Sequence, residues 1–116
     1  MKTLTELLVI EMDAPLDAEK MMLAAQKFEG THNFESFRAT ACQSNQPVRT
    51  VSHCRLIQHG AYLVLDIQAD GFLHHMVRNI MGCLLEIGQG MYEVDHIDAI
   101  FAAEDRKAAG VTAPPD

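Results

Sequence analysis

The chain has 116 residues, of which 48% are hydrophobic and 22% charged, a composition typical of one ordinary globular domain. Its formal net charge of −7 at pH 7 argues against the chain alone being a general nucleic-acid binder, because phosphate binding depends on clustered Lys and Arg. No apolar run is long enough to span a membrane, and the N-terminus is too short and too acidic for a signal peptide.

The first segments of the chain predict a strand, a helix and an irregular stretch. Residues 7–12 favour a strand, because Leu8, Val9 and Ile10 are apolar and partly β-branched, and Pro15 ends it. Asp17 has the character of a helix N-cap, apolar residues follow it at helical spacing, and Gly30 marks the end of this helix. The next stretch, residues 31–46, is polar and irregular.

The middle of the chain predicts a β-hairpin. One strand runs over residues 48–57 and the other over residues 62–69, with His59 and Gly60 at the turn. In the second strand, apolar residues alternate with a mixed set. One face of the hairpin is therefore apolar and the other partly solvated.

Two helices are predicted after the hairpin. Residues 72–87 are predicted to form a helix, because their apolar members make a broad arc at helical spacing, and Gly88 ends it. A last helix covers residues 94–103, and residues 104–116 show no further element.

The resulting order, β-α-β-β-α-α, indicates an α+β fold. It corresponds to a ferredoxin-like half with an antiparallel sheet, helices on one face, and its final strand missing. Residues 1–116 would form a single domain. A sheet that lacks a strand has an open edge, and open edges pair readily with another chain.

The three cysteines, Cys42, Cys54 and Cys83, are odd in number and show no Cys-x-x-Cys spacing. The sequence therefore indicates neither a disulfide framework nor a zinc site. Free, mostly buried thiols are typical of a reducing compartment, so we expect a cytoplasmic protein.

Arg78 is the residue on the helix at 72–87 that most needs an explanation. At 100° per residue it falls at the margin of the apolar arc, one turn after His74 and one turn before Gly82. An arginine at the edge of a buried face needs an acceptor, because an unpaired buried charge is unfavourable. Spacing alone leaves two explanations open. The guanidinium reaches solvent or pairs with a nearby carboxylate, or it carries a function.

Four segments, in this order along the chain, resemble the C-terminal half of the tRNA pseudouridine synthase A family. They are residues 30–39 (GTHNFESFRA), 47–51 (PVRTV), 69–82 (ADGFLHHMVRNIMG) and 105–114. Residues 15–19 also fit the family's lead-in to its helix. The resemblance covers nearly the whole chain from Pro15 onward.

The resemblance implies an activity and a set of residue roles. Members of the family isomerise uridine to pseudouridine in the anticodon arm of tRNA, without a metal or an organic cofactor. An aspartate attacks the flipped-out nucleotide, and an arginine that pairs with this aspartate orients it; Arg78 matches that arginine. Arg38 and Arg49 match positions that flank the RNA cleft in the family, and we expect Arg38, Arg49, His74 and Arg106 to contact RNA. For Arg38 and Arg49, solvated loop arginines remain an equal alternative.

Three features of the family are absent from this sequence. It contains no Arg-Thr-Asp-x-Gly-Val-His run, which would carry the nucleophile, and no catalytic tyrosine on a strand before Pro15. A Gly-Leu-Tyr-Leu strand expected after Pro114 is missing as well. We therefore expect the chain alone to be inactive and to bind tRNA weakly unless an N-terminal half completes it.

A metal site at the two adjacent histidines is not favoured. His74 and His75 on one helix would point about 100° apart, so with Cys83 they would not converge on an ion. His74 would instead contact a phosphate or support Arg78.

Two hypotheses of different classes follow. The first is an enzyme part, competent only with an N-terminal half. The second is a stand-alone, non-catalytic module that oligomerises and binds RNA or protein. In either case we expect a homodimer, because the open sheet edge and the apolar sides of Leu63, Leu65 and Ile67 need to be covered. Arg78 would then lie near the interface and take a carboxylate from its own chain or from the second copy.

Overall fold

The computed structural model describes residues 3–37 and 47–103, and it confirms the α+β fold. The elements, in chain order, are β1 (Leu4–Glu11), α1 (Ala18–Gln26), β2 (Gly30–Asn33), a short 3-10 helix η1 (Glu35–Phe37), β3 (Val48–His59), β4 (Tyr62–Ala69), α2 (Met76–Gly88) and α3 (His96–Ala103).

The four strands form one antiparallel sheet in the order β1-β4-β3-β2. β1 and β3, which are separated in the chain by α1, β2 and η1, are not neighbours in the sheet, since β4 lies between them. This is the split arrangement expected of a ferredoxin-like half. Among the described residues, no strand pairs with the other edge of β1.

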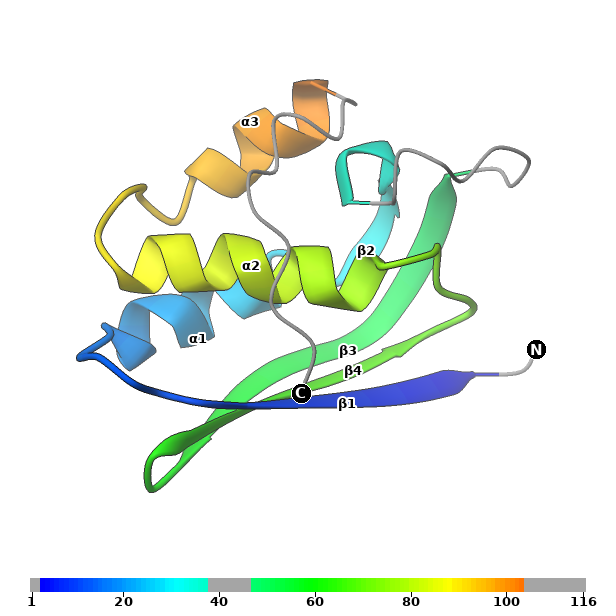
Figure 1. The fold of residues 1–116 in the computed structure, drawn as a ribbon. Coiled ribbons are helices and arrows are strands. Elements are labelled where there is room, and N and C mark those ends of the chain that lie inside the picture. The colour runs from blue at the N-terminus through cyan, green and yellow to red at the C-terminus, as the bar shows by residue number, and fades with distance from the viewer. Residues whose placement is uncertain (1–2, 38–46, 104–116) are drawn as a thin grey trace.

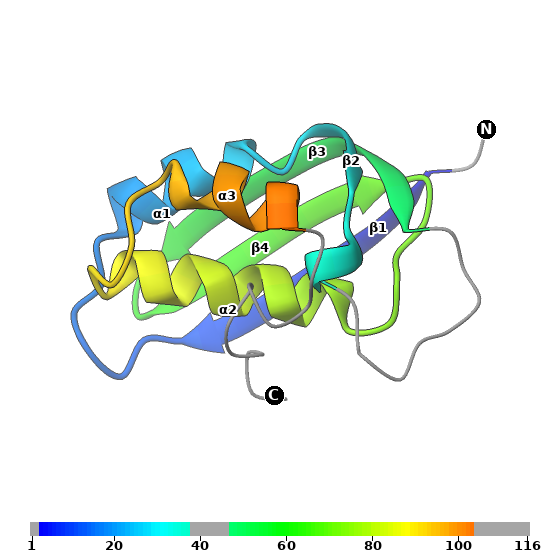
Figure 2. The ribbon, with the colours of Figure 1, turned by 90° about the horizontal axis from the view of Figure 1, so that it is seen from above.

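All three helices lie on the same face of the sheet, as Figures 1 and 2 show. The core lies between this face and α1 and α2, where Leu8, Leu56 and Leu65 meet across three strands. Leu63, Leu65 and Ile67 are fully buried there. The expectation that these three side chains need a second chain to cover them is therefore wrong, because the chain's own helices cover them.

The helix predicted from residue 72 begins instead at Met76. His75 adopts the left-handed conformation, with φ 62° and ψ 8°, and a helix cannot run through such a residue. The amide of Met76 donates to the carbonyl of Leu73 at 3.0 Å, which closes a separate turn that contains His74 and His75. His74 is therefore not one helical turn below Arg78, as the spacing had predicted.

A short strand, β2, was not predicted. Gly30–Asn33 pairs with the first residues of β3, although its sequence GTHN is polar. The hydroxyls of Thr31 and Thr50 lie 2.8 Å apart across this pair. Tertiary pairing at the end of a longer strand thus outweighs the weak strand propensity of the segment.

The hairpin and the last helix are close to prediction. β3 extends to His59, so that Gly60 and Ala61 form the turn, and Gly60 has the positive φ (61°) that tight hairpin turns require. α3 begins at His96, two residues later than predicted. Of the helices described, none is long and apolar enough to cross a membrane.

Candidate functional site

A cavity of about 260 Å³ lies between β1 and the beginning of α2. Glu6 is the residue of β1 that lines it, and the rest of the lining comes from the turn before α2 and its first residues, namely Phe72, Leu73, His74, His75, Met76, Val77 and Arg78. Two residues proposed from the sequence, His74 and Arg78, therefore share one cavity.

The backbone of His75 shapes this cavity. It occupies the N-cap position of α2 in the left-handed conformation, and its side chain makes no capping hydrogen bond. A non-glycine residue in this conformation is strained, and such strain is most often kept at functional sites. The turn sets the ring centroids of His74 and His75 4.1 Å apart, and both side chains are exposed to solvent. Two imidazoles and a guanidinium thus line the same hollow.

Arg78 is half-buried in the first turn of α2. The next residue, Asn79, anchors the start of this helix to η1. Asn79 is 1% exposed, and its Nδ2 donates to the backbone carbonyl of Phe37 at 2.7 Å. Neighbouring Ser36 is also buried, and its hydroxyl donates to the carbonyl of Ile100 at 2.8 Å. The start of α2, η1 and α3 are therefore joined by buried polar contacts directly beside Arg78.

Sequence reasoning missed Glu6 as a site residue. In β1, Leu8 and Ile10 face the helices, because they lie opposite Leu65 and Leu63. Glu6 continues that same face two residues earlier, where a carboxylate interrupts an apolar series. This interruption was the signal available in the sequence. It brings a carboxylate to the cavity that Arg78 lines.

Arg49 lies next to the site but does not line the cavity. A Cβ built on Gly71 would come within 3.3 Å of the Nε atom of Arg49, so the side chain crosses the turn before α2 at close range. Asp70 ties this turn to β3: its Oδ1 accepts from the amide of Thr50 at 3.0 Å, and its own amide donates to the carbonyl of Thr50 at 3.1 Å. Arg38, Cys42 and Arg106 lie outside the described residues.

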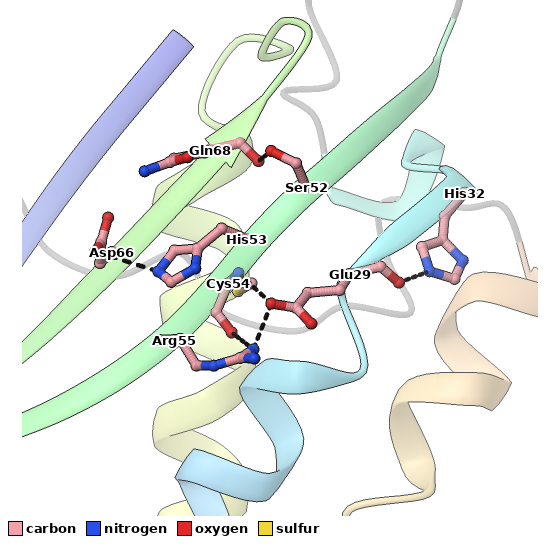
Figure 3. Close-up of polar contacts among 8 residues, drawn as sticks. All are labelled: Glu29, His32, Ser52, His53, Cys54, Arg55, Asp66 and Gln68. Carbon is pink, nitrogen blue, oxygen red and sulfur yellow. Dashed lines mark hydrogen bonds and ion pairs between the residues drawn. The ribbon is translucent and has the colours of Figure 1, made fainter. Parts of the chain in front are cut away.

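A second polar cluster lies around the middle of β3 (Figure 3). Glu29 forms an ion pair with Arg55, and its Oε2 also accepts from the amide of Cys54 at 2.8 Å. Further along, Nε2 of His53 lies 3.3 Å from Oδ2 of Asp66. Because β2 begins at Gly30, opposite Val51, the Glu29 carboxylate satisfies a β3 amide that β2 does not reach. The cluster thus has a structural explanation.

The two described cysteines are unsuited to nucleophilic chemistry. Burial, followed by the charge of Glu29, raises the pKa of Cys54 to about 12, and burial, followed by Glu86, does the same for Cys83. Both remain thiols at neutral pH. Over residues 3–37 and 47–103, no three His, Cys, Asp or Glu side chains gather as a metal ion would require.

Comparisons with known proteins identify relatives of this chain. A family profile described as tRNA pseudouridine synthase matches residues 24–116. The chain is 85% identical to the tRNA pseudouridine synthase A of Acinetobacter baumannii over 101 residues, which cover 87% of this chain and 38% of that protein. The corresponding protein of Acinetobacter baylyi is 81% identical, with 87% and 37% covered, and that of Pseudomonas aeruginosa is 52% identical, with 87% and 35% covered. The chain thus spans less than two fifths of these relatives' length, and β1 precedes the residues that the family profile matches.

Proposed function

The chain belongs to the tRNA pseudouridine synthase family, and from this membership we propose that it forms the arginine-bearing part of an active site that isomerises uridine in tRNA. The observation that carries the proposal is the position of Arg78. It lines a cavity together with His74 and His75, at the helix that most resembles the family.

Arg78 would act by holding a carboxylate. A guanidinium presents fixed donors that pair with both oxygens of a carboxylate, which keeps that group ionised and correctly aimed. In the proposed reaction this carboxylate is the aspartate nucleophile. The sequence contains no Arg-Thr-Asp-x-Gly-Val-His run, so another segment has to supply it. The proposal therefore includes inactivity of this chain by itself, because a covalent nucleophile has no electrostatic substitute.

RNA would reach the site over the turn before α2. We propose as phosphate contacts His74, which lines the cavity, and Arg49, which lies beside that turn. The sequence adds Arg38 and Arg106 to this set. A net charge of −7 opposes RNA binding by the chain alone, so we propose tight binding only for a completed protein. The reaction would need no metal or organic cofactor, and we place the protein in the cytoplasm.

The second candidate function is a stand-alone module without catalysis. One observation favours it: β1, which precedes the residues matched by the family profile, completes the fold. Leu8 of this strand is 5% exposed and belongs to the hydrophobic core. A segment outside the matched residues therefore stabilises the rest. In both functions a second copy of the chain is an expected partner.

Release of tritium from tRNA labelled at C5 of uridine tests the proposal. The pure chain should release none above background. The same chain mixed with a fragment of the Acinetobacter baumannii relative that lacks the segment corresponding to this chain should release tritium. Release by the chain alone would overturn the proposed inactivity. A mixture whose components are folded but which releases no tritium would favour the stand-alone module.

A further inference from the structure

The charge of the cavity beside α2 comes from two separate parts of the chain. Arg78 supplies a permanent positive charge, and the imidazoles of His74 and His75 each add one when they are protonated. Among the described residues that line the cavity, Glu6 of β1 is the only one with an acidic side chain. Opposite charges in one hollow offset each other's field, so the cavity is close to neutral while the two histidines are uncharged.

The strand register places Glu6 on the cavity side of the sheet. Glu6 lies opposite Ile67 of β4, two positions before the pair formed by Leu8 and Leu65. These three apolar side chains are buried beneath the helices, so Glu6 continues the face that the helices cover. Its own side chain is exposed at the cavity, which α2, beginning at Met76, does not fill.

A carboxylate at this position opposes the groups that the proposed function brings to the cavity. In that function Arg78 holds an aspartate carboxylate and His74 contacts an RNA phosphate, and both incoming groups are oxyanions. A like charge in the same hollow lowers the affinity for either of them. Glu6 lies on β1, which precedes the residues matched by the family profile. The opposing charge thus belongs to this chain's own first strand.

We propose that Glu6 is a specificity-determining residue, whose carboxylate balances the charge of Arg78 and keeps oxyanions out of the cavity while this chain is by itself. The proposal rests on the proposed function for the nature of these ligands, a phosphate or a second carboxylate. A cavity of about 260 Å³ has room for several water molecules, and hence for a small ion. The barrier is therefore charge and not size.

Glu11, at the other end of β1, provides a matched control. It lies five residues further along the strand, about 17 Å away in an extended chain, and it lines a different cavity. Both carboxylates are exposed. Glu6→Gln and Glu11→Gln each remove one negative charge from a chain of formal net charge −7, so a general charge effect would be equal in the two variants. Only Glu6→Gln removes a charge from the cavity beside α2.

Titration of the intact chain with inorganic phosphate, and separately with acetate, tests the proposal. The ring proton signals of His74 and His75 in the NMR spectrum report binding, and His74→Gln and His75→Gln assign them. His59, at the hairpin turn, reports non-specific effects of the ions at constant, low ionic strength. Circular dichroism checks that each variant is folded.

Glu6→Gln should tighten the apparent binding of phosphate at least about threefold, and that of acetate by less, because acetate carries the smaller charge. Glu6→Thr, a neutral residue that suits a strand, repeats the test in a second variant. Glu6→Asp keeps the charge and should bind as weakly as the unmodified chain, and Glu11→Gln should also leave binding unchanged. Tightening for phosphate alone would assign the barrier to RNA phosphates, whereas tightening for both ions extends it to an incoming carboxylate.

Equal affinity of the unmodified chain and Glu6→Gln for both ions would overturn the proposal, as would equal tightening by Glu11→Gln. The absence of any shift at His74 and His75 in the Glu6→Gln chain would do the same. These titrations contain no tRNA, so their failure would leave the proposed activity untouched. An enzyme assembled from the matched residues 24–116 does not contain Glu6, so the absence of tritium release there would not bear on this residue.

Discussion

The side-chain amide of Asn79 donates to the backbone carbonyl of Phe37 at 2.7 Å, in a site where both residues are buried. Asn79 directly follows Arg78, and Phe37 directly precedes Arg38. One hydrogen bond thus joins the two segments that carry these arginines. It fixes the start of α2 against η1 across 42 residues of sequence.

Replacing Asn79 tests the importance of this bond. Asn79→Ala should lower the free energy of unfolding by about 1–3 kcal/mol, because the buried carbonyl of Phe37 loses its donor. Urea denaturation measures the change. Gln26→Ala removes an exposed amide on α1 and should change stability by less than about 0.5 kcal/mol. Equal effects of the two substitutions would show that the buried bond contributes nothing specific.

Glu29 should stabilise the part of β3 that β2 does not reach. Glu29→Ala removes the acceptor of the Cys54 amide and the partner of Arg55, and should cost about 1–3 kcal/mol in unfolding free energy. Glu29→Gln keeps an acceptor oxygen and should cost less. Glu19→Ala, at an exposed carboxylate in the first turn of α1, serves as the control in the same denaturation experiment. A larger loss for Glu19→Ala would contradict this account of the cluster.

The buried thiols predict a loss of stability at alkaline pH. The folded-state pKa values of Cys54 and Cys83 are raised from 9.0 to about 12, so folding favours the protonated thiols. Their contribution is complete below pH 9 and is lost as the pH rises from 9 toward 12. The unfolding free energy should therefore fall over this range by a few kcal/mol, since one pKa unit corresponds to about 1.4 kcal/mol.

A double variant isolates this effect from other alkaline titrations. In a Cys42→Ser background, Cys54→Ala with Cys83→Ala should show a visibly shallower loss of stability between pH 9 and pH 11. Thermal melts at each pH provide the comparison. Identical pH profiles with and without the two thiols would exclude them as its cause.

The sequence predicted most of the fold because its strongest patterns are local. The alternation in the second hairpin strand predicted Tyr62–Ala69 with correct bounds, and Gly60 marked the turn. β2 was missed because GTHN has little strand propensity and pairs only through tertiary context. The start of α2 was misplaced because the left-handed backbone of His75 has no signature in a residue type that normally avoids it.

The candidate site was predictable only in part, for a similar reason. The resemblance identified Arg78 and His74, and the structure brings both to one cavity. It did not point to Glu6, which lies outside the residues that the family profile matches. Only the strand register shows that this carboxylate faces the helices. Contacts between distant segments, such as Asn79 with Phe37, have no pattern in the sequence to mark them.

Binding of tRNA by the isolated chain should be weak. The net charge of −7 opposes phosphate contacts, so we expect a dissociation constant no tighter than the non-specific range, about 10⁻⁴ to 10⁻⁶ M at physiological salt. Fluorescence anisotropy with labelled tRNA measures it. Affinity should also fall steeply as salt is raised. A nanomolar midpoint would contradict the expectation and favour an RNA-binding module.

The central claim is that Arg78 can serve as an active-site arginine when this chain stands in place of the corresponding segment of a relative. The most direct test is tritium release by a chimera in which the matched residues of this chain replace the corresponding segment of the Acinetobacter baumannii relative. The account predicts that the chimera releases tritium from labelled tRNA and that Arg78→Lys reduces release by at least 100-fold, about 2.7 kcal/mol, while the variant still binds tRNA. Undiminished release by the Arg78→Lys chimera would contradict it.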